Sequence, residues 1–154
     1  VKLILMYHMK PTDAVALYNR YIGDWGGTST SYRFEAVKNG KVVKVVRKEP
    51  VTSMHLSAEP DHQNLTERHT YEAAEIRIRA LDQNDNIVSF YQEPVVLSTE
   101  GPIAIIGPEI ISLQGGMGGT YVRTTGEEGV GILKIKAAQM EEQRILFEVK
   151  NDRK

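Results

Sequence analysis

Hydrophobic and polar residues alternate in short runs along positions 51–149, and polar or glycine-containing turns separate the runs. In the clearest run, aliphatic residues at positions 74, 76, 78 and 80 alternate with charged residues, as expected for a strand with one solvent-facing side. Further short strands are predicted at residues 54–56, 87–91, 95–98, 103–106, 110–113, 120–124, 131–137 and 145–149. The polar stretch at 59–70 is predicted to be a loop. Many short strands with regular turns favour an immunoglobulin-like β-sandwich.

The first fifty residues follow a different pattern. Thr12 is a plausible N-cap and Asp13 suits the first turn of a helix. Apolar residues of that helix share one face, namely Ala14, Leu17, Tyr18, Tyr21 and Ile22. Residues 32–37 and 41–46 are predicted to form a hairpin, because Asn39-Gly40 between them is a strong turn signal. The predicted fold class is mainly β: a helix-plus-hairpin (α+β) segment at 1–50, which we interpret as the end of a preceding domain, and a sandwich at 51–150.

Composition and charge narrow the function. The chain has no cysteine, which excludes disulfides, zinc–thiolate sites and cysteine nucleophiles. No apolar run reaches the roughly 18–20 residues of a membrane span, so a soluble protein is expected. Residues 1–50 carry a net charge of +5 and residues 51–154 a net charge of −6. The helix has one arginine, Arg20, which is too little positive charge to predict nucleic-acid binding.

The segment from Asp82 to Asn86, with Glu93 eleven residues after Asp82, has oxygen ligands at positions 1, 3, 5 and 12 of a calcium loop. However, Ile87 stands where such a loop needs its glycine, and the flanking residues are predicted strands. A polar hairpin turn is the favoured interpretation.

Two other segments contain residue types used in ligand sites. His62 and His69 lie near Asp61 and Glu67, but their spacing matches no zinc pattern, and a solvated loop is expected. The glycines at 115–119 lack the lysine and the following helix of a phosphate-binding loop, so a flexible connection between strands is expected. Neither a metal site nor a cofactor is predicted.

Aromatic residues offer the candidates for a carbohydrate-binding surface. Trp25 and Tyr32 lie at the edges of a loop rich in glycine, serine and threonine, where exposed rings could stack on a sugar. Packing of both rings inside the protein is the alternative, and it is the one we expect. No catalytic residue is predicted.

Four stretches of the sequence, at residues 33–43, 70–86, 97–102 and 123–131, together resemble the C-terminal part of family 2 glycoside hydrolases. Residues 33–43 resemble the hairpin that ends one immunoglobulin-like domain in the C-terminal part of those enzymes. Residues 70–86, 97–102 and 123–131 resemble the domain that follows it, including a D-x-N-G-N turn in which Asp85 replaces the glycine. The phrases V-x-T-E-G-P and R-T-T-G-E-x-G are also similar. Related domains occur in bacterial surface adhesins.

The resemblance implies a non-catalytic C-terminal accessory region of a β-galactosidase-like enzyme, with other domains of the parent chain as partners. In that family, two glutamates on a separate (β/α)8 barrel do the chemistry. Neither the barrel nor its motifs occur here, so Glu72, Glu75 and Glu100 do not inherit those roles. Polysaccharide remains a further candidate partner. An adhesin-type bacterial surface interaction module is the alternative, and the sequence does not fix the compartment.

Overall fold

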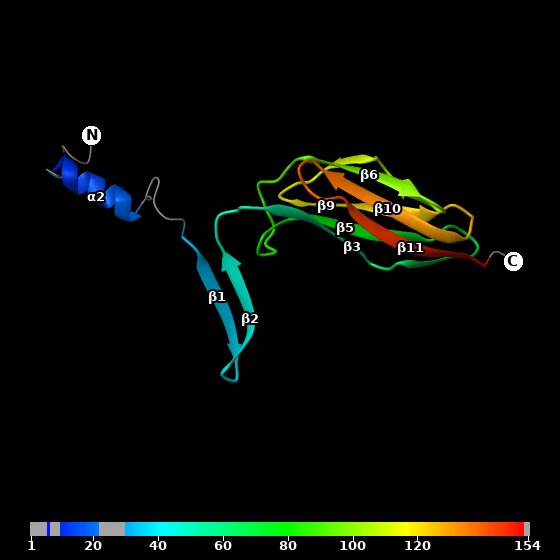
Figure 1. Cartoon of the computed structure of the whole chain (residues 1–154), viewed down its shortest axis with the longest axis horizontal. Helices are drawn as coiled ribbons and strands as arrows, with labels where there is room; N and C mark the ends of the chain where they lie inside the picture. Colours follow the sequence, from blue (N-terminus) through cyan, green and yellow to red (C-terminus); the bar gives the residue numbers. More distant parts are fainter. Residues whose placement is uncertain (1–5, 7–9, 22–29, 153–154) are drawn as a thin grey trace. The chain divides into compact units, whose positions relative to one another are not determined.

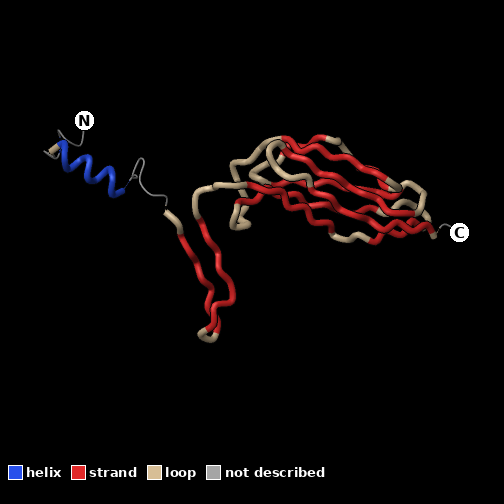
Figure 2. Tube along the Cα trace, in the orientation of Figure 1, coloured by secondary structure: helices blue, strands red, loops and turns tan. Residues whose placement is uncertain are grey.

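The structure, a computed structural model, describes residues 6, 10–21 and 30–152. The chain divides into two compact units, Val1–Pro50 and Val51–Lys154. Strands predominate over helix in the described residues, which confirms the mainly-β fold class (Figure 2). No helix within these residues has the length and apolar character that crossing a membrane requires.

The first unit contains helix α2 (Pro11–Tyr21). The helix begins one residue before the predicted N-cap, because the Lys10 carbonyl accepts from Asp13 N–H at 2.9 Å. The Asp13 carboxylate in turn accepts from Lys10 N–H at 3.3 Å. Pro11 therefore takes the first helical position, where its missing N–H carries no penalty, and the prediction of Thr12 as N-cap was wrong.

The first unit also contains the predicted hairpin, formed by β1 (Tyr32–Lys38) and β2 (Lys41–Lys48). The connecting residues Asn39 and Gly40 have φ angles of 52° and 73°, the left-handed pair that a tight hairpin turn requires. A β-bulge follows Ala36.

The second unit is a two-layer β-sandwich (Figure 1). Its strands are β3 (Met54–Pro60), β4 (Asn64–Glu67), β5 (Ala73–Asp82), β6 (Pro94–Glu100), β7 (Ile103–Ile106), β8 (Ile110–Ser112), β9 (Met117–Thr124), β10 (Gly129–Ala137) and β11 (Gln143–Asn151). One sheet has the order β4-β11-β10-β6-β8 and the other the order β3-β5-β9-β7. All pairings are antiparallel except β11 with β4.

The core lies between the two sheets and follows the predicted alternation. In β5, the inward residues at 74, 76, 78 and 80 are fully buried, whereas Arg77 is exposed. The opposite sheet contributes Val95, Leu97, Leu133, Ile135 and Phe147, each at most 1% exposed. This core confirms the strand register read from the sequence.

Two segments differ from prediction. The polar stretch at 59–70 contains strand β4, which pairs in parallel with the end of β11. Residues 87–91 form no strand; Ile87 makes one isolated bridge to Leu81 and the chain then turns. The strand-forming residues of this segment instead lie in a loop that covers the core, and the side chains of Val88 and Tyr91 are buried there.

A candidate site at the polar end of the sandwich

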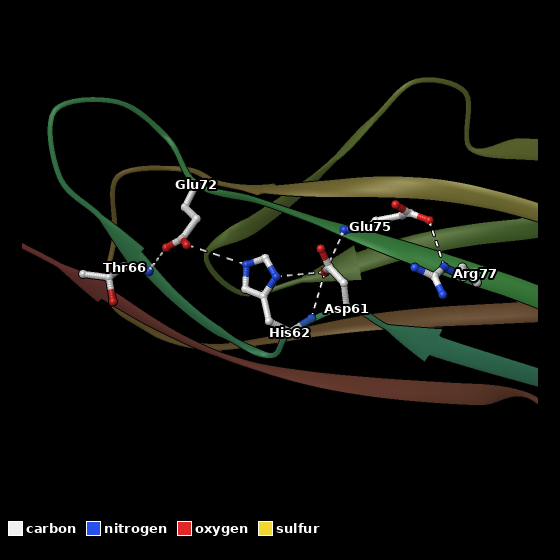
Figure 3. Close-up of polar contacts among 6 residues, drawn as sticks. All are labelled: Asp61, His62, Thr66, Glu72, Glu75 and Arg77. Atoms are coloured by element: carbon white, nitrogen blue, oxygen red, sulfur yellow. Dashed lines mark hydrogen bonds and ion pairs between the residues drawn. The ribbon is translucent and has the colours of Figure 1, made fainter.

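A cluster of polar side chains joins the end of β3, strand β4 and the start of β5 (Figure 3). His62 is its centre: Nδ1 lies 2.9 Å from Asp61 Oδ1, and Nε2 lies 3.6 Å from Glu72 Oε1. Asp61 Oδ1 also accepts from the backbone N–H of His62 at 2.8 Å and of Glu75 at 3.0 Å. Glu72 Oε2 accepts from Thr66 N–H. These contacts hold three consecutive segments of the chain together. We call the cluster of Asp61, His62, Thr66 and Glu72 the polar clasp.

The surroundings of Asp61 favour its ionised form. Burial alone would raise the pKa of Asp61, but the backbone N–H groups of His62 and Glu75, together with the nearby imidazole, lower it overall. Each ring nitrogen of His62 faces a carboxylate, and Nε2 is buried without a hydrogen-bond partner. Because Nε2 is buried and Nδ1 lies against the Asp61 carboxylate, the position of this imidazole favours a structural role.

The cluster borders an open depression of about 440 Å³. Its walls are Asn64, Thr66, Arg68, His69, Thr70, Tyr71 and Glu72. The Arg123 guanidinium lies 5.5 Å from the centre of the Tyr71 ring and occupies one of its faces. His62 thus belongs to the clasp and His69 to the depression. The described residues contain no group of three or more His, Asp or Glu side chains suited to holding a metal ion.

Residues 123–131, which contain the R-T-T-G-E-x-G motif, make further contacts at this end of the sandwich. Glu67, predicted to lie in a solvated loop, is 1% exposed, and its Oε2 accepts from Gly126 N–H at 2.8 Å. Gly126 also accepts from the Asn151 side chain at 2.6 Å. Thr124 exchanges two hydrogen bonds with the backbone of Glu72, at 3.0 and 3.1 Å. These contacts join β4 and β11 to the end of β9, so the motif stabilises the fold at this end of the sandwich.

The calcium-like segment is a turn, as favoured from the sequence. Asp82 is 5% exposed, and its Oδ1 accepts from the backbone N–H groups of Asn84 at 2.8 Å and Asn86 at 2.9 Å. The Asn86 side chain donates to the same carboxylate at 3.0 and 3.1 Å. Asp82 is therefore committed to holding the turn.

The glycine-rich segment is more ordered than the flexible connection predicted. Gly118 and Gly119 belong to β9, and Gly116 donates to Tyr91 O and accepts from Ala80 N–H, both at 2.9 Å. A Cβ at Gly116 would lie 2.4 Å from Val88 O, and its φ is 76°. Only glycine fits this position, because the backbone both turns and closely approaches Val88 in the connection between β5 and β6.

The carbohydrate candidates from the sequence have different outcomes. Trp25 lies outside the described residues. Tyr32, in the first unit, is 59% exposed and its ring stacks on Phe34 with centroids 6.4 Å apart, so the expectation that this ring packs inside the protein was wrong. Sugar binding by either residue stays a prediction.

The three glutamates considered above all have partners. Glu72 belongs to the clasp, and Glu75 pairs with Arg77 at 3.1 Å. Glu100 pairs with Lys134 on the neighbouring strand. The sequence signal for the clasp was the adjacent Asp61-His62 pair after Pro60, but its partner Glu72 could be found only from the fold.

No family model matches the chain. A β-galactosidase of Rhizobium radiobacter is 35% identical over 135 residues, which are 82% of this chain and 92% of that protein. A β-galactosidase of Rhizobium meliloti is 34% identical over 99 residues, which are 63% of this chain and 13% of that protein. A glycosyl hydrolase family 2 member from Bacteroides cellulosilyticus shares the fold, with a TM-score of 0.63 at 16% identity over 78% of this chain and 17% of that chain.

These similarities confirm the family resemblance seen in the sequence. The chain spans nearly all of one curated relative but only 13% of the other. The structural likeness adds that the same fold forms a small part of a much larger enzyme. On the identity to the Rhizobium radiobacter protein, the chain belongs to the β-galactosidase family, with the fold of a domain of a family 2 glycoside hydrolase.

Proposed function

We propose that this chain is a non-catalytic, C-terminal accessory region of a larger β-galactosidase, in which it packs against other domains of the parent protein. Its role is then structural: it positions or stabilises the catalytic domains. The small share of the Rhizobium meliloti relative that the chain matches supports this proposal.

The observation that carries the proposal is the hairpin of the first unit. Its two strands form a sheet of their own, and a two-stranded sheet is marginally stable in water. Large apolar side chains remain exposed on it: Phe34 by 57%, Val37 by 61% and Val43 by 60%. Exposed apolar groups concentrated on so small a sheet are typical of a surface that another part of the protein covers.

The carboxylates of the sandwich support the same proposal. Hydrolysis of a glycoside by the usual mechanism needs two carboxyl groups roughly 5–10 Å apart across a sugar-sized cleft. Glu72, Glu75 and Glu100, to which the family's catalytic roles do not carry over, have basic or backbone partners within the fold.

Amide hydrogen exchange tests the proposal. We expect the amides of residues 32–48 to exchange quickly in the isolated chain and at least about tenfold more slowly in the full parent enzyme, because burial and pairing protect backbone N–H groups. The core amides of β5 and β10 are the internal control and should be protected in both. Equal, rapid exchange of the hairpin in both proteins would contradict packing against the parent.

A further inference from the structure

A second depression of about 440 Å³ lies in the sandwich, at the end opposite to the polar cluster. It is lined by Met54, Phe90, Tyr91, Gln92, Glu93, Ala138 and Gln139. These residues come from the start of β3, the connection between β5 and β6, and the turn between β10 and β11. None of the phrases that carry the family resemblance contributes to it.

Phe90 is held on a rigid turn although its ring is 67% exposed. Tyr91 N–H donates to Val88 O at 3.0 Å, and Val88 N–H donates to Ala80 O at 2.9 Å. Gly116 N–H donates to Tyr91 O at 2.9 Å, which ties the end of the turn to the connection between β8 and β9. The backbone is thus fixed on both sides of an aromatic ring that contributes little to the core, a preorganised arrangement that lowers the entropic cost of binding.

The polar groups around the ring are available for hydrogen bonds. Gln92, Glu93 and Gln139 are exposed, and their side chains make no hydrogen bond to the other described residues. Gln139 has a φ of 62°, an uncommon conformation for a residue with a side chain.

Tyr91 also lines the depression, and its hydroxyl group is buried. Its side chain is 94% buried (6% exposed), and its hydroxyl has no partner within the described part of the chain. Burial raises the pKa of Tyr91, and the Glu93 carboxylate raises it further. The phenol therefore stays a neutral hydrogen-bond donor, and a buried donor without an acceptor is costly.

We propose that this depression binds a neutral sugar ring. An exposed aromatic ring offers a flat platform for the C–H face of a pyranose, and amide and carboxylate groups beside it match the hydroxyls at the ring edge. Of the described residues that line the depression, none is a cation, and Glu93 would repel an acidic sugar. The proposal goes beyond the accessory role, since it gives the sandwich a ligand of its own.

The test is a titration of the full chain with lactose, a neutral galactoside, followed by backbone amide NMR. Saturable shifts are expected at residues 88–93 and 138–140. Phe90→Ala should weaken binding by about tenfold or more, because it removes the platform, while Phe90→Tyr should retain it. Phe90 is exposed, so the alanine variant should keep the parent's spectrum elsewhere.

Tyr121→Ala is the matched control, since it removes a ring that is 50% exposed on the outer face of the β3-β5-β9-β7 sheet, away from the lining of the depression. It should leave lactose binding unchanged. The proposal is overturned if lactose causes no saturable shift at 88–93, if the shifts survive Phe90→Ala, or if they map to the hairpin around Tyr32 instead. None of these results bears on exchange protection of residues 32–48, so the two proposals fail separately.

Discussion

At the scale of single residues, Asp85 shows that the chain keeps the turn at residues 82–86 although aspartate replaces the glycine of the D-x-N-G-N motif. The resemblance places glycine there, and the backbone of Asp85 has a φ of 59°, where glycine is favoured. Aspartate is among the side chains that tolerate this conformation best. Its carboxylate also lies 3.3 Å from His55 Nε2 on β3. The substitution is therefore accommodated locally, with the turn held by Asp82.

Asp61 makes a prediction about acid stability. Because its pKa is lowered in the folded state from the ordinary value of 3.8, its contribution to stability is present above pH 3.8 and is lost as pH falls through the lower folded-state pKa. Asp61→Asn should melt below the parent at pH 7, and the gap in Tm should narrow below about pH 3.8.

Thermal melts followed by circular dichroism from neutral to strongly acidic pH check this. Glu127→Gln, which removes an exposed carboxylate, serves as the control. A gap that stays constant or widens in acid would show that Asp61 does not stabilise the fold as a carboxylate.

At the scale of elements, the strands that the sequence predicts are those with regular alternation of apolar and polar residues. Strand β4 was missed because its four residues contain one apolar side chain, Leu65, and its pairing partner lies more than eighty residues away. Residues 87–91 were assigned to a strand because they are rich in strand-forming residues. In the structure, tertiary contacts hold them instead as a turn that covers the core. Propensity alone does not separate these outcomes.

The register of β5 makes a direct prediction. Ile78→Asp should destabilise the sandwich by roughly 4 kcal/mol or more, because it places an unpaired carboxylate in the core. Arg77→Asp, on the neighbouring exposed position, should cost roughly 1 kcal/mol or less. Urea unfolding of both variants measures the difference, and an inverted order of stability would mean that the strand faces the other way.

At the scale of the whole molecule, sequence reasoning reached the sandwich, the hairpin and the family, but not the polar clasp. The clasp, and the contacts that residues 124–126 make beside it, depend on which loops meet at one end of the two sheets. Glu72 meets Thr124 across fifty-two positions, and Glu67 meets Gly126 across fifty-nine. Neither pair has a local signal, because each residue type is ordinary for a surface turn. Their proximity can be inferred only once the order of the strands in the two sheets is known.

The accessory role predicts that the isolated chain does not cleave aryl β-galactosides, since Glu72, Glu75 and Glu100 have basic or backbone partners within the fold and the family's catalytic glutamates lie on a separate barrel. Release of the chromophore should stay at the level of a mock purification. Glu72→Gln and Glu100→Gln variants give the decisive comparison. Turnover well above the mock level, removed by one of these changes, would make the chain an enzyme in its own right.

The two-stranded hairpin also bears on how the chain behaves when it is produced alone. In the described part of the chain, β1 and β2 each have one edge whose backbone groups no other strand pairs. Such edges are templates for pairing with another molecule. Dimers or larger species of the isolated chain that grow with concentration would then arise from these open edges. Their stoichiometry would say nothing about how the parent enzyme assembles.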